Sequence, residues 1–131
     1  MKERETGMIK TSILVLSLLA AGTAQAKTEK MNASSYCKCY KCCGKHPGDA
    51  GYGITASGAI VRQGMVAVDK KYIRLGTRIK IHGMPGTYIA MDTGSAIKGK
   101  RIDIYNPSHN SALKFGRKFV KVTILRRGKK A

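Results

Sequence analysis

The chain has 131 residues, with 25 lysines and arginines against 7 aspartates and glutamates, which gives a formal net charge of +18. This length allows one domain, with or without a targeting segment, and the 43% hydrophobic content argues against wholesale disorder. Aromatic residues make up only 6% and tryptophan is absent, which argues against ligand binding by broad aromatic stacking. The acidic residues are so few that each can be considered individually.

The first 26 residues have the layout of a secretory signal peptide. Lys2, Arg4 and Lys10 precede the apolar run ILVLSLLAAG at 13–22, and AQA at 24–26 is a small-x-small cleavage site. The apolar run is shorter than the ~20 residues that span a membrane. We therefore expect a cleaved, exported chain without a stable membrane span, and an uncleaved anchor is the alternative.

Export predicts a periplasmic, cell-wall or extracellular location. There, a basic domain meets anionic wall polymers and peptide carboxylates. Nucleic acid is not an expected partner, because the basic residues are scattered and have no aromatic residues interleaved with them.

The rest of the chain is predicted to form short strands after an irregular start. Residues 27–35 are polar and are expected to be a flexible leader. Residues 36–53 contain all four cysteines with Gly and Pro, which predicts an irregular cross-linked loop. Five apolar runs of strand character follow, separated by glycine-bearing turns, at 65–69, 77–82, 87–92, 101–105 and 118–125. The connection Gly83-Met84-Pro85-Gly86 predicts a hairpin over 77–92.

One short helix is predicted at 107–115. Asn106 suits the cap, Pro107 suits the first helical position and Gly116 suits the exit. Residues 126–131 are expected to be a basic tail. So many short strands need closure to hide their edges, so the elements favour a mainly β fold, a small barrel with one helix.

The cysteines form the pattern C-x-C-x-x-C-C, an even number in an exported chain, for which disulfides are the default. Bonds between close neighbours would be strained, so we expect Cys37 and Cys39 each to pair with one of Cys42 and Cys43, with the connectivity open. A zinc site with His46 as a further ligand is the alternative. It is disfavoured because the spacing is unusual and adjacent cysteines rarely bind the same ion.

Three aspartates, Asp69, Asp92 and Asp103, lie at or near the ends of predicted strands. Aspartate has a low β propensity, and turn capping explains any one of these residues. Three of the five acidic residues beyond the targeting segment nevertheless favour a shared polar site. Clustered, partly buried carboxylates raise one pKa and keep a proton available for acid/base chemistry. Three aspartates alone are a weak signal for a metal, and none is assigned.

The segment around these aspartates resembles the 3D domain, a family named for three aspartates. The motifs are VAVDKKYIRLGT at 66–77 and YIAMDTGSAIKGKRIDIY at 88–105. CCG at 42–44, GITASG at 53–58 and ALKFGR at 112–117 extend the resemblance over 36–125. It implies a six-stranded double-psi β-barrel, also found in the related membrane-bound lytic transglycosylase A.

The resemblance implies a peptidoglycan lytic transglycosylase that needs no cofactor. Such an enzyme cleaves glycan strands between N-acetylmuramic acid and N-acetylglucosamine and leaves anhydro-muramyl ends. By position, Asp103 matches the acid/base, and Asp92 and Asp69 match its supporting pair. The residues expected to contact the glycan are Thr55, Thr93, Gly94 and Lys98.

Several alternatives stay open at this point. Asp92 could serve as the second carboxylate of an ordinary hydrolase. A wall-binding module without turnover and a cationic protein that damages envelopes by charge are the other candidates. Lys70, Arg74 and Ser95 depart from the family pattern, and none of them removes a catalytic group. The sequence does not predict the oligomeric state.

Overall fold

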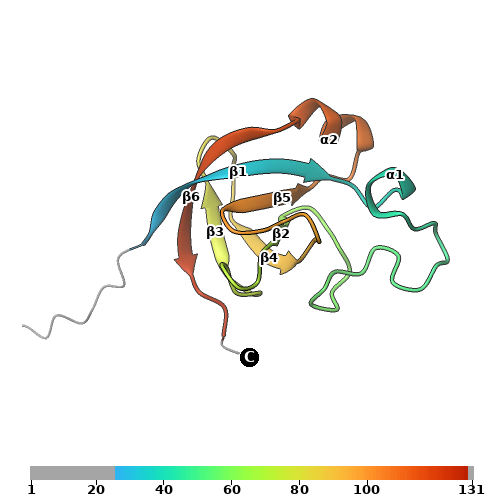
Figure 1. Ribbon diagram of the computed structural model, residues 1–131, viewed down its shortest axis with the longest axis horizontal. Coiled ribbons are helices and arrows are strands. Elements are labelled where there is room, and N and C mark those ends of the chain that lie inside the picture. The colour runs from blue at the N-terminus through green and yellow to red at the C-terminus, as the bar shows by residue number, and fades with distance from the viewer. Residues whose placement is uncertain (1–25, 130–131) are drawn as a thin grey trace, which may run out of the picture.

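The computed structural model describes residues 26–129, which form six strands and two short helices (Figure 1). The strands are β1 (Thr28–Tyr36), β2 (Met65–Val68), β3 (Arg78–Ile81), β4 (Tyr88–Asp92), β5 (Arg101–Tyr105) and β6 (Lys118–Arg126), and the helices are α1 (Tyr40–Cys43) and α2 (His109–Phe115). The strands close into a barrel in the order β1-β5-β2-β4-β3-β6. The predicted mainly β class and closed six-stranded barrel are confirmed.

The predicted signal peptide, residues 1–26, lies outside the described residues except for its last position. Within 26–129, no helix is long and apolar enough to cross a membrane.

Two pairs of neighbouring strands are parallel, β1 with β5 and β2 with β4, and the other neighbours are antiparallel. Because β1 and β5 run the same way, the segments that follow them leave from the same end of the barrel. Figure 1 shows α1 directly after the arrowhead of β1, with α2 beside the second half of that strand. This end of the barrel therefore gathers the cysteine-rich segment and α2.

The barrel interior is filled by aliphatic side chains from alternate strand positions. Its fully buried members include Val66 and Val68 of β2 and Ile102 of β5. Successive side chains of a strand point to opposite faces. Ala67 and Asp103, which lie between core residues on their strands, therefore face outward.

Residues 27–35 are not the flexible leader that the sequence predicted, because residues 28–36 form β1. This strand pairs on one side with β5 and on the other with β6. Met31 and Ala33 are 1% and 0% exposed and face the interior, while the polar residue between them, Asn32, faces outward. The strand contributes one large apolar side chain to the core, so its alternation is easily overlooked in the sequence.

The later elements lie close to their predicted positions. The antiparallel pairing of β3 with β4 confirms the hairpin over 77–92. Helix α2 begins two residues later than predicted, because Ser108 caps it and accepts a hydrogen bond from the Ser111 N–H at 3.3 Å. Asn106 instead accepts from the Ser108 N–H. Helix α1, within the cysteine-rich loop, was not predicted.

Part of the predicted basic tail is fixed to the barrel. The Gly128 N–H donates to Thr77 Oγ1 at 2.9 Å. A Cβ at position 128 would lie 2.1 Å from the carbonyl oxygen of Leu75, so only glycine fits this close approach.

If β1 is an integral part of the barrel, Met31→Ala should lower the free energy of unfolding by about 2–5 kcal/mol, the usual cost of truncating a buried methionine. Denaturant unfolding followed by circular dichroism measures this change. The neighbouring substitution Lys30→Ala, on the exposed face of the same strand, should cost less than about 1 kcal/mol. Equal and small effects at both positions would contradict the barrel role of β1.

Candidate functional site

The strand register places Asp92 and Asp103 on either side of Ala67. Ala67 of β2 is the partner of Asp103 on β5 and of Asp92 on β4, and Ser34 of β1 is the partner of Asp103 on its other side. Ser34, Asp103, Ala67 and Asp92 thus form a line across four strands, here called the carboxylate row. With strands about 4.8 Å apart, the two aspartate Cα atoms lie roughly 10 Å apart, and Ala67, whose small side chain is 4% exposed, lies between them in the row.

A β-bulge brings Asp92 to the row. Val66 pairs with Ala90, but the next residue, Ala67, pairs with Asp92, so Met91 is passed over. Under strict alternation, Asp92 would point into the barrel on the same side as Ala90. A bulge re-aims the following side chain, and this one turns the carboxylate of Asp92 outward.

Asp92 is held by three hydrogen-bond donors. The Tyr36 hydroxyl donates to Oδ2 at 2.9 Å, and the N–H groups of Ala56 and Thr93 donate to Oδ1 at 2.8 and 2.9 Å. Burial, together with the adjacent charge of Asp92, raises the pKa of Tyr36 well above its ordinary value. Tyr36 therefore stays protonated and keeps donating, which fixes the orientation of the Asp92 carboxylate.

Asp103 has a different environment. Its carboxylate is partly buried and accepts a hydrogen bond at Oδ1 from the Ser34 hydroxyl at 2.9 Å. Burial raises the pKa of Asp103, and the nearby charge of Asp92 raises it further, while the Ser34 hydrogen bond and the charge of Arg101 oppose the rise. The net direction is upward, as a general acid requires.

Asp103 lies where two surface hollows meet. The main hollow, about 330 Å³, is bounded by the cysteine-rich segment and by the loop after β4, and its lining includes Lys38, Lys45, Ile54, Ala67, Asp92, Thr93, Gly94, Ile97 and Asp103. The second hollow, about 370 Å³, includes Ser34, Arg101, Asp103, Leu113 and Arg117. Cys42, Ile97, Tyr36 and Asp103 line both. The two hollows therefore adjoin and are together called the groove, with Asp103 among the residues at their boundary.

Asp69 does not line this groove. Its carboxylate accepts hydrogen bonds from the N–H groups of Gly99 and Lys71 at 2.9 and 3.0 Å, and these bonds, that from Gly99 first, lower the pKa of Asp69. The residue ties the loop after β4 to the end of β2. Of the three predicted aspartates, the structure brings two together and gives the third an anchoring position.

The residues predicted to contact substrate are divided in the same way. Thr93 and Gly94 line the main hollow, whereas Lys98 lines an adjoining hollow with Asp69. Thr55 is 4% exposed, and its hydroxyl bonds Ser57 Oγ and accepts from the Ala59 N–H. Thr55 thus shapes the turn that presents the Ala56 N–H to Asp92 and does not line the groove.

Several groove residues were missed by the sequence analysis. Ser34 lies in the segment that was expected to be a flexible leader, and Tyr36, Lys38 and Lys45 lie in the segment that was expected to be an irregular cysteine-rich loop. The alternation of Met31 and Ala33 with polar residues is the signal that could have placed Ser34 on an outer barrel face.

The predicted disulfides are not formed. All four cysteines are free in the described part of the chain. The Sγ atoms of Cys37 and Cys39 are 2.6 Å apart and those of Cys37 and Cys42 are 3.4 Å apart, longer than the ~2.05 Å of a disulfide. The Cys43 thiol points elsewhere and donates to the Cys37 carbonyl oxygen at 3.1 Å.

The thiol cluster also includes a histidine. His109 Nδ1 lies 3.3 Å from Cys39 Sγ and 3.6 Å from the Sγ atoms of Cys37 and Cys42. Hydrogen bonding from the Cys37 thiol lowers the pKa of Cys39 to about 6, while burial raises the pKa of Cys37 to about 12. These four side chains are the described residues that are grouped closely enough to hold a metal ion.

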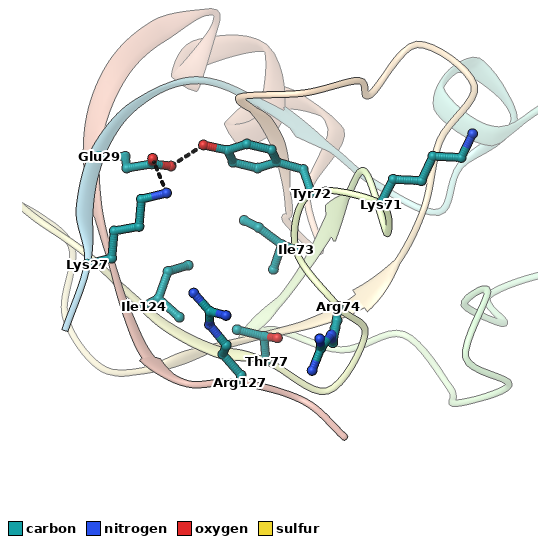
Figure 2. Close-up of a pocket in the computed structure, with 9 residues that line it drawn as sticks. All are labelled: Lys27, Glu29, Lys71, Tyr72, Ile73, Arg74, Thr77, Ile124 and Arg127. Atoms are coloured by element: carbon teal, nitrogen blue, oxygen red, sulfur yellow. Dashed lines mark hydrogen bonds and ion pairs between the residues drawn. The ribbon is translucent and has the colours of Figure 1, made fainter. Parts of the chain in front are cut away.

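A separate hollow of about 250 Å³ lies by the start of β1, at the opposite end of that strand from Tyr36. Figure 2 shows that its carboxylate, Glu29, forms an ion pair with Lys27 and accepts a hydrogen bond from the Tyr72 hydroxyl. The ion pair measures 2.8 Å. Basic side chains occupy much of the remaining wall, and none of the three aspartates reaches it. With its carboxylate neutralised, this hollow offers no comparable acid/base chemistry.

Residues 64–126 match the family model of the 3D domain, which confirms the resemblance indicated by the motifs and identifies this segment as a 3D domain. YabE of Bacillus subtilis (strain 168), whose name describes cell wall shaping, is 43% identical over 77 residues. The cell wall-binding protein YocH of the same organism is 39% identical over 77 residues. Each match covers 56% of this chain but only 19% of YabE and 26% of YocH.

Two solved structures are also similar. They are E. coli MltA with bound chitohexaose, at 22% identity, and the lytic transglycosylase LtgG of Burkholderia pseudomallei, at 21% identity. Each covers 58% of this chain, and 28% and 27% of the respective structure, with a TM-score of 0.49. The barrel topology of this chain is shown by its own strand pairing.

The electrostatics of the carboxylate row predict opposite effects of two substitutions on Asp103. Asp92→Asn removes a neighbouring negative charge and should lower the pKa of Asp103, whereas Ser34→Ala removes a hydrogen bond to its charged form and should raise it further. Carboxyl NMR titration of Asp103 measures both shifts. A pKa of Asp103 at or below the ordinary ~3.9 in the unmodified protein would contradict the proposed environment.

Proposed function

We propose that this chain is an exported peptidoglycan lytic transglycosylase with Asp103 as its acid/base. The observation that carries the proposal is the position of Asp103, a partly buried carboxyl group of raised pKa in the groove, beside the fixed carboxylate of Asp92. The names of the relatives YabE and YocH point to the cell wall, and the predicted signal peptide agrees with a wall location.

The two aspartates suit different roles because their hydrogen bonds differ. Asp92 accepts from three donors, which occupy both of its oxygens. In the described part of the chain, the carboxylate of Asp103 accepts one, at Oδ1, so Oδ2 is available to carry a proton into the groove. Asp103 would therefore exchange protons, and Asp92 would supply a fixed negative charge.

In the first step, a glycan strand lies along the groove with its scissile bond at Asp103. Asp103 donates its proton to the glycosidic oxygen, the bond from that oxygen to the muramic acid C1 breaks, and positive charge develops on the sugar ring. The carboxylate of Asp92 stabilises this oxocarbenium-like centre electrostatically.

In the second step, Asp103, now ionised, removes the proton of the C6 hydroxyl of the same muramic acid residue. The C6 oxygen then bonds to C1 and closes an internal 1,6-anhydro ring, and Asp103 regains its proton. A hydrolase would need a second carboxylate to activate water or to attack C1. The three donors on Asp92 disfavour that role and support the anhydro product.

The remaining groove residues suit an amphipathic, partly anionic glycan. Ile54, which is 46% exposed, and Leu113, which is 65% exposed, offer apolar surface to sugar rings. Lys38 and Lys45 on one side of Asp103, with Arg117 on the other, suit the peptide carboxylates of peptidoglycan. We therefore propose glycan strands of peptidoglycan as the partner.

A wall-binding module without turnover is the second candidate, because YocH is named a cell wall-binding protein. Such a module would use the same groove but would not depend on a protonated Asp103. Loss of cleavage with retained binding therefore separates the two functions.

Digestion of purified peptidoglycan, followed by mass spectrometry of the soluble products, tests the enzymatic proposal. The protein should release anhydro-muropeptides, and Asp103→Asn should lower the rate at least about 100-fold, the usual contribution of an acid/base group. Asp49→Asn is the matched control, because Asp49 lies in the cysteine-rich loop outside the groove lining and its substitution leaves Asp103 in place.

Three results would contradict this proposal. Hydrolysed rather than anhydro ends would show a hydrolase. Binding without cleavage, equal in the unmodified protein and in Asp103→Asn, would favour the wall-binding module. Envelope damage that survives Asp103→Asn but disappears at high salt would indicate a charge-driven effect.

The position of Ala67 between the two aspartates gives a steric test that leaves both carboxylates in place. Ala67→Leu should put a larger side chain between Asp92 and Asp103 and lower the cleavage rate at least about 10-fold, because the sugar ring can no longer reach Asp103. Ala67→Ser, of nearly the original volume, should retain most of the rate. Thermal unfolding of both variants checks that the barrel is intact. An unchanged cleavage rate in folded Ala67→Leu would show that the sugar ring does not bind over Ala67.

A further inference from the structure

We propose that Cys37, Cys39, Cys42 and His109 form a structural zinc site that joins the cysteine-rich loop to α2. This site is separate from the carboxylate row and requires no glycan substrate, so it stands independently of the proposed catalytic function.

The topology explains how ligands so distant in sequence meet. Cys37 directly follows β1, and α2 follows β5 after a short turn. The two strands are parallel and in register, with Tyr36 opposite Tyr105, and the Asn106 N–H donates to the Tyr36 carbonyl oxygen at 2.7 Å. His109, the first residue of α2, is thereby brought over the start of the cysteine-rich loop.

The spacing of the ligand atoms suits tetrahedral coordination. With Zn–S near 2.3 Å and Zn–N near 2.05 Å, a tetrahedral ion holds its nitrogen and sulfur ligands roughly 3.6 Å apart. His109 Nδ1 lies 3.6 Å from the Sγ atoms of Cys37 and Cys42 and 3.3 Å from that of Cys39. All four ligand atoms lie within 4.8 Å of one another.

Two sulfur–sulfur distances must lengthen when the ion binds. Two thiolates on one tetrahedral zinc stand roughly 3.8 Å apart, whereas Cys37 and Cys42 are separated by 3.4 Å and Cys37 and Cys39 by 2.6 Å. Cys39 is partly exposed and Cys42 is exposed, and neither belongs to the barrel core, so their side chains can make shifts of about 1 Å without disturbing it.

The chemistry of the donor set selects zinc. Three thiolates and one imidazole are the ligands of structural zinc sites, and four protein ligands leave no open position for a reacting water. The zinc alternative considered from the sequence included His46, whereas the histidine that lies with the cysteines is His109. His46 stacks on the Tyr40 ring, 4.3 Å between centroids, and is not one of the cluster residues.

The site would brace one wall of the groove. Cys42 lines both hollows beside Asp103. Lys38, which lines the main hollow, stands between Cys37 and Cys39 in the sequence. The cysteine-rich loop contributes no residue to the apolar core of the barrel apart from the buried Cys37 at its start. A metal ion bound by the three cysteines and by His109 would connect this loop to α2. Structural zinc sites stabilise other small folds in this way.

The test uses the full chain, purified under phosphine reductant and incubated with zinc chloride, then desalted and analysed for metal by mass spectrometry. We expect about one zinc per chain and a raised thermal unfolding temperature. With cobalt chloride in place of zinc, we expect the absorption bands of tetrahedral thiolate-bound Co²⁺.

Two matched pairs of variants locate the site. Cys42→Ser and His109→Ala should weaken zinc binding at least about 10-fold, the minimum expected for removing a ligand. Cys43→Ser and His46→Ala should retain it, because these residues lie next to the cluster in sequence but outside it in space. Circular dichroism of each variant checks the barrel, whose core does not contain Cys42 or His109.

Three outcomes would overturn the proposal. These are absence of stoichiometric zinc in the reduced protein, equal loss of zinc in Cys43→Ser and Cys42→Ser, and a Cys37–Cys39 disulfide in the protein recovered from the zinc incubation. If Cys42→Ser loses zinc but still cleaves peptidoglycan, the metal site is supported and only its effect on the groove is excluded. The zinc proposal and the catalytic proposal can therefore fail separately.

Discussion

The arrangement of the groove depends on the register of β2 between β5 and β4. Because Ala67 is the partner of both Asp103 and Asp92, the two carboxylates face the same side of the barrel with only a methyl group between them. The bulge after Val66 is part of this constraint, since without it Asp92 would point into an aliphatic core. An unpaired carboxylate there would cost far more than one bulge. The bulge therefore does two things: it keeps the carboxylate of Asp92 out of the core, and it sets the geometry of the groove.

The same backbone gives three aspartates three environments. Asp92 accepts hydrogen bonds from β1, from the turn at 54–60 and from its own loop. Asp103 has one donor in the described part of the chain, and burial raises its pKa. Asp69 receives two backbone N–H groups, which lower its pKa and connect β2 to the loop that presents Thr93 and Gly94. Differences in burial and hydrogen bonding, rather than in residue type, therefore separate the environments of Asp103, Asp92 and Asp69.

Sequence reasoning succeeded where the signal is local. The strands β2 to β6 were predicted to within about two residues, because their apolar runs are bounded by glycine turns. It failed at β1, whose segment TEKMNASSY contains one large apolar residue and depends on pairing with β5 and β6 for its order. The cysteine-rich pattern predicted disulfides, which are not formed, and did not identify His109 as a neighbour, since His109 lies 67 residues beyond Cys42. Such a contact follows from the parallel pairing of β1 with β5, which no local pattern reveals.

The end of β1 connects the two sites of the molecule. Tyr36 donates to Asp92, and the next residue, Cys37, enters the thiol cluster. Residues 64–126, the part identified as a 3D domain, supply Ala67, Asp92 and Asp103, whereas Ser34, Tyr36 and the cysteine-rich wall lie before it. The 3D segment thus holds both carboxylates of the carboxylate row, and the preceding segment supplies hydrogen bonds to them and lines one side of the groove. Tyr36, which orients Asp92, therefore directly precedes Cys37, the first residue of the thiol cluster.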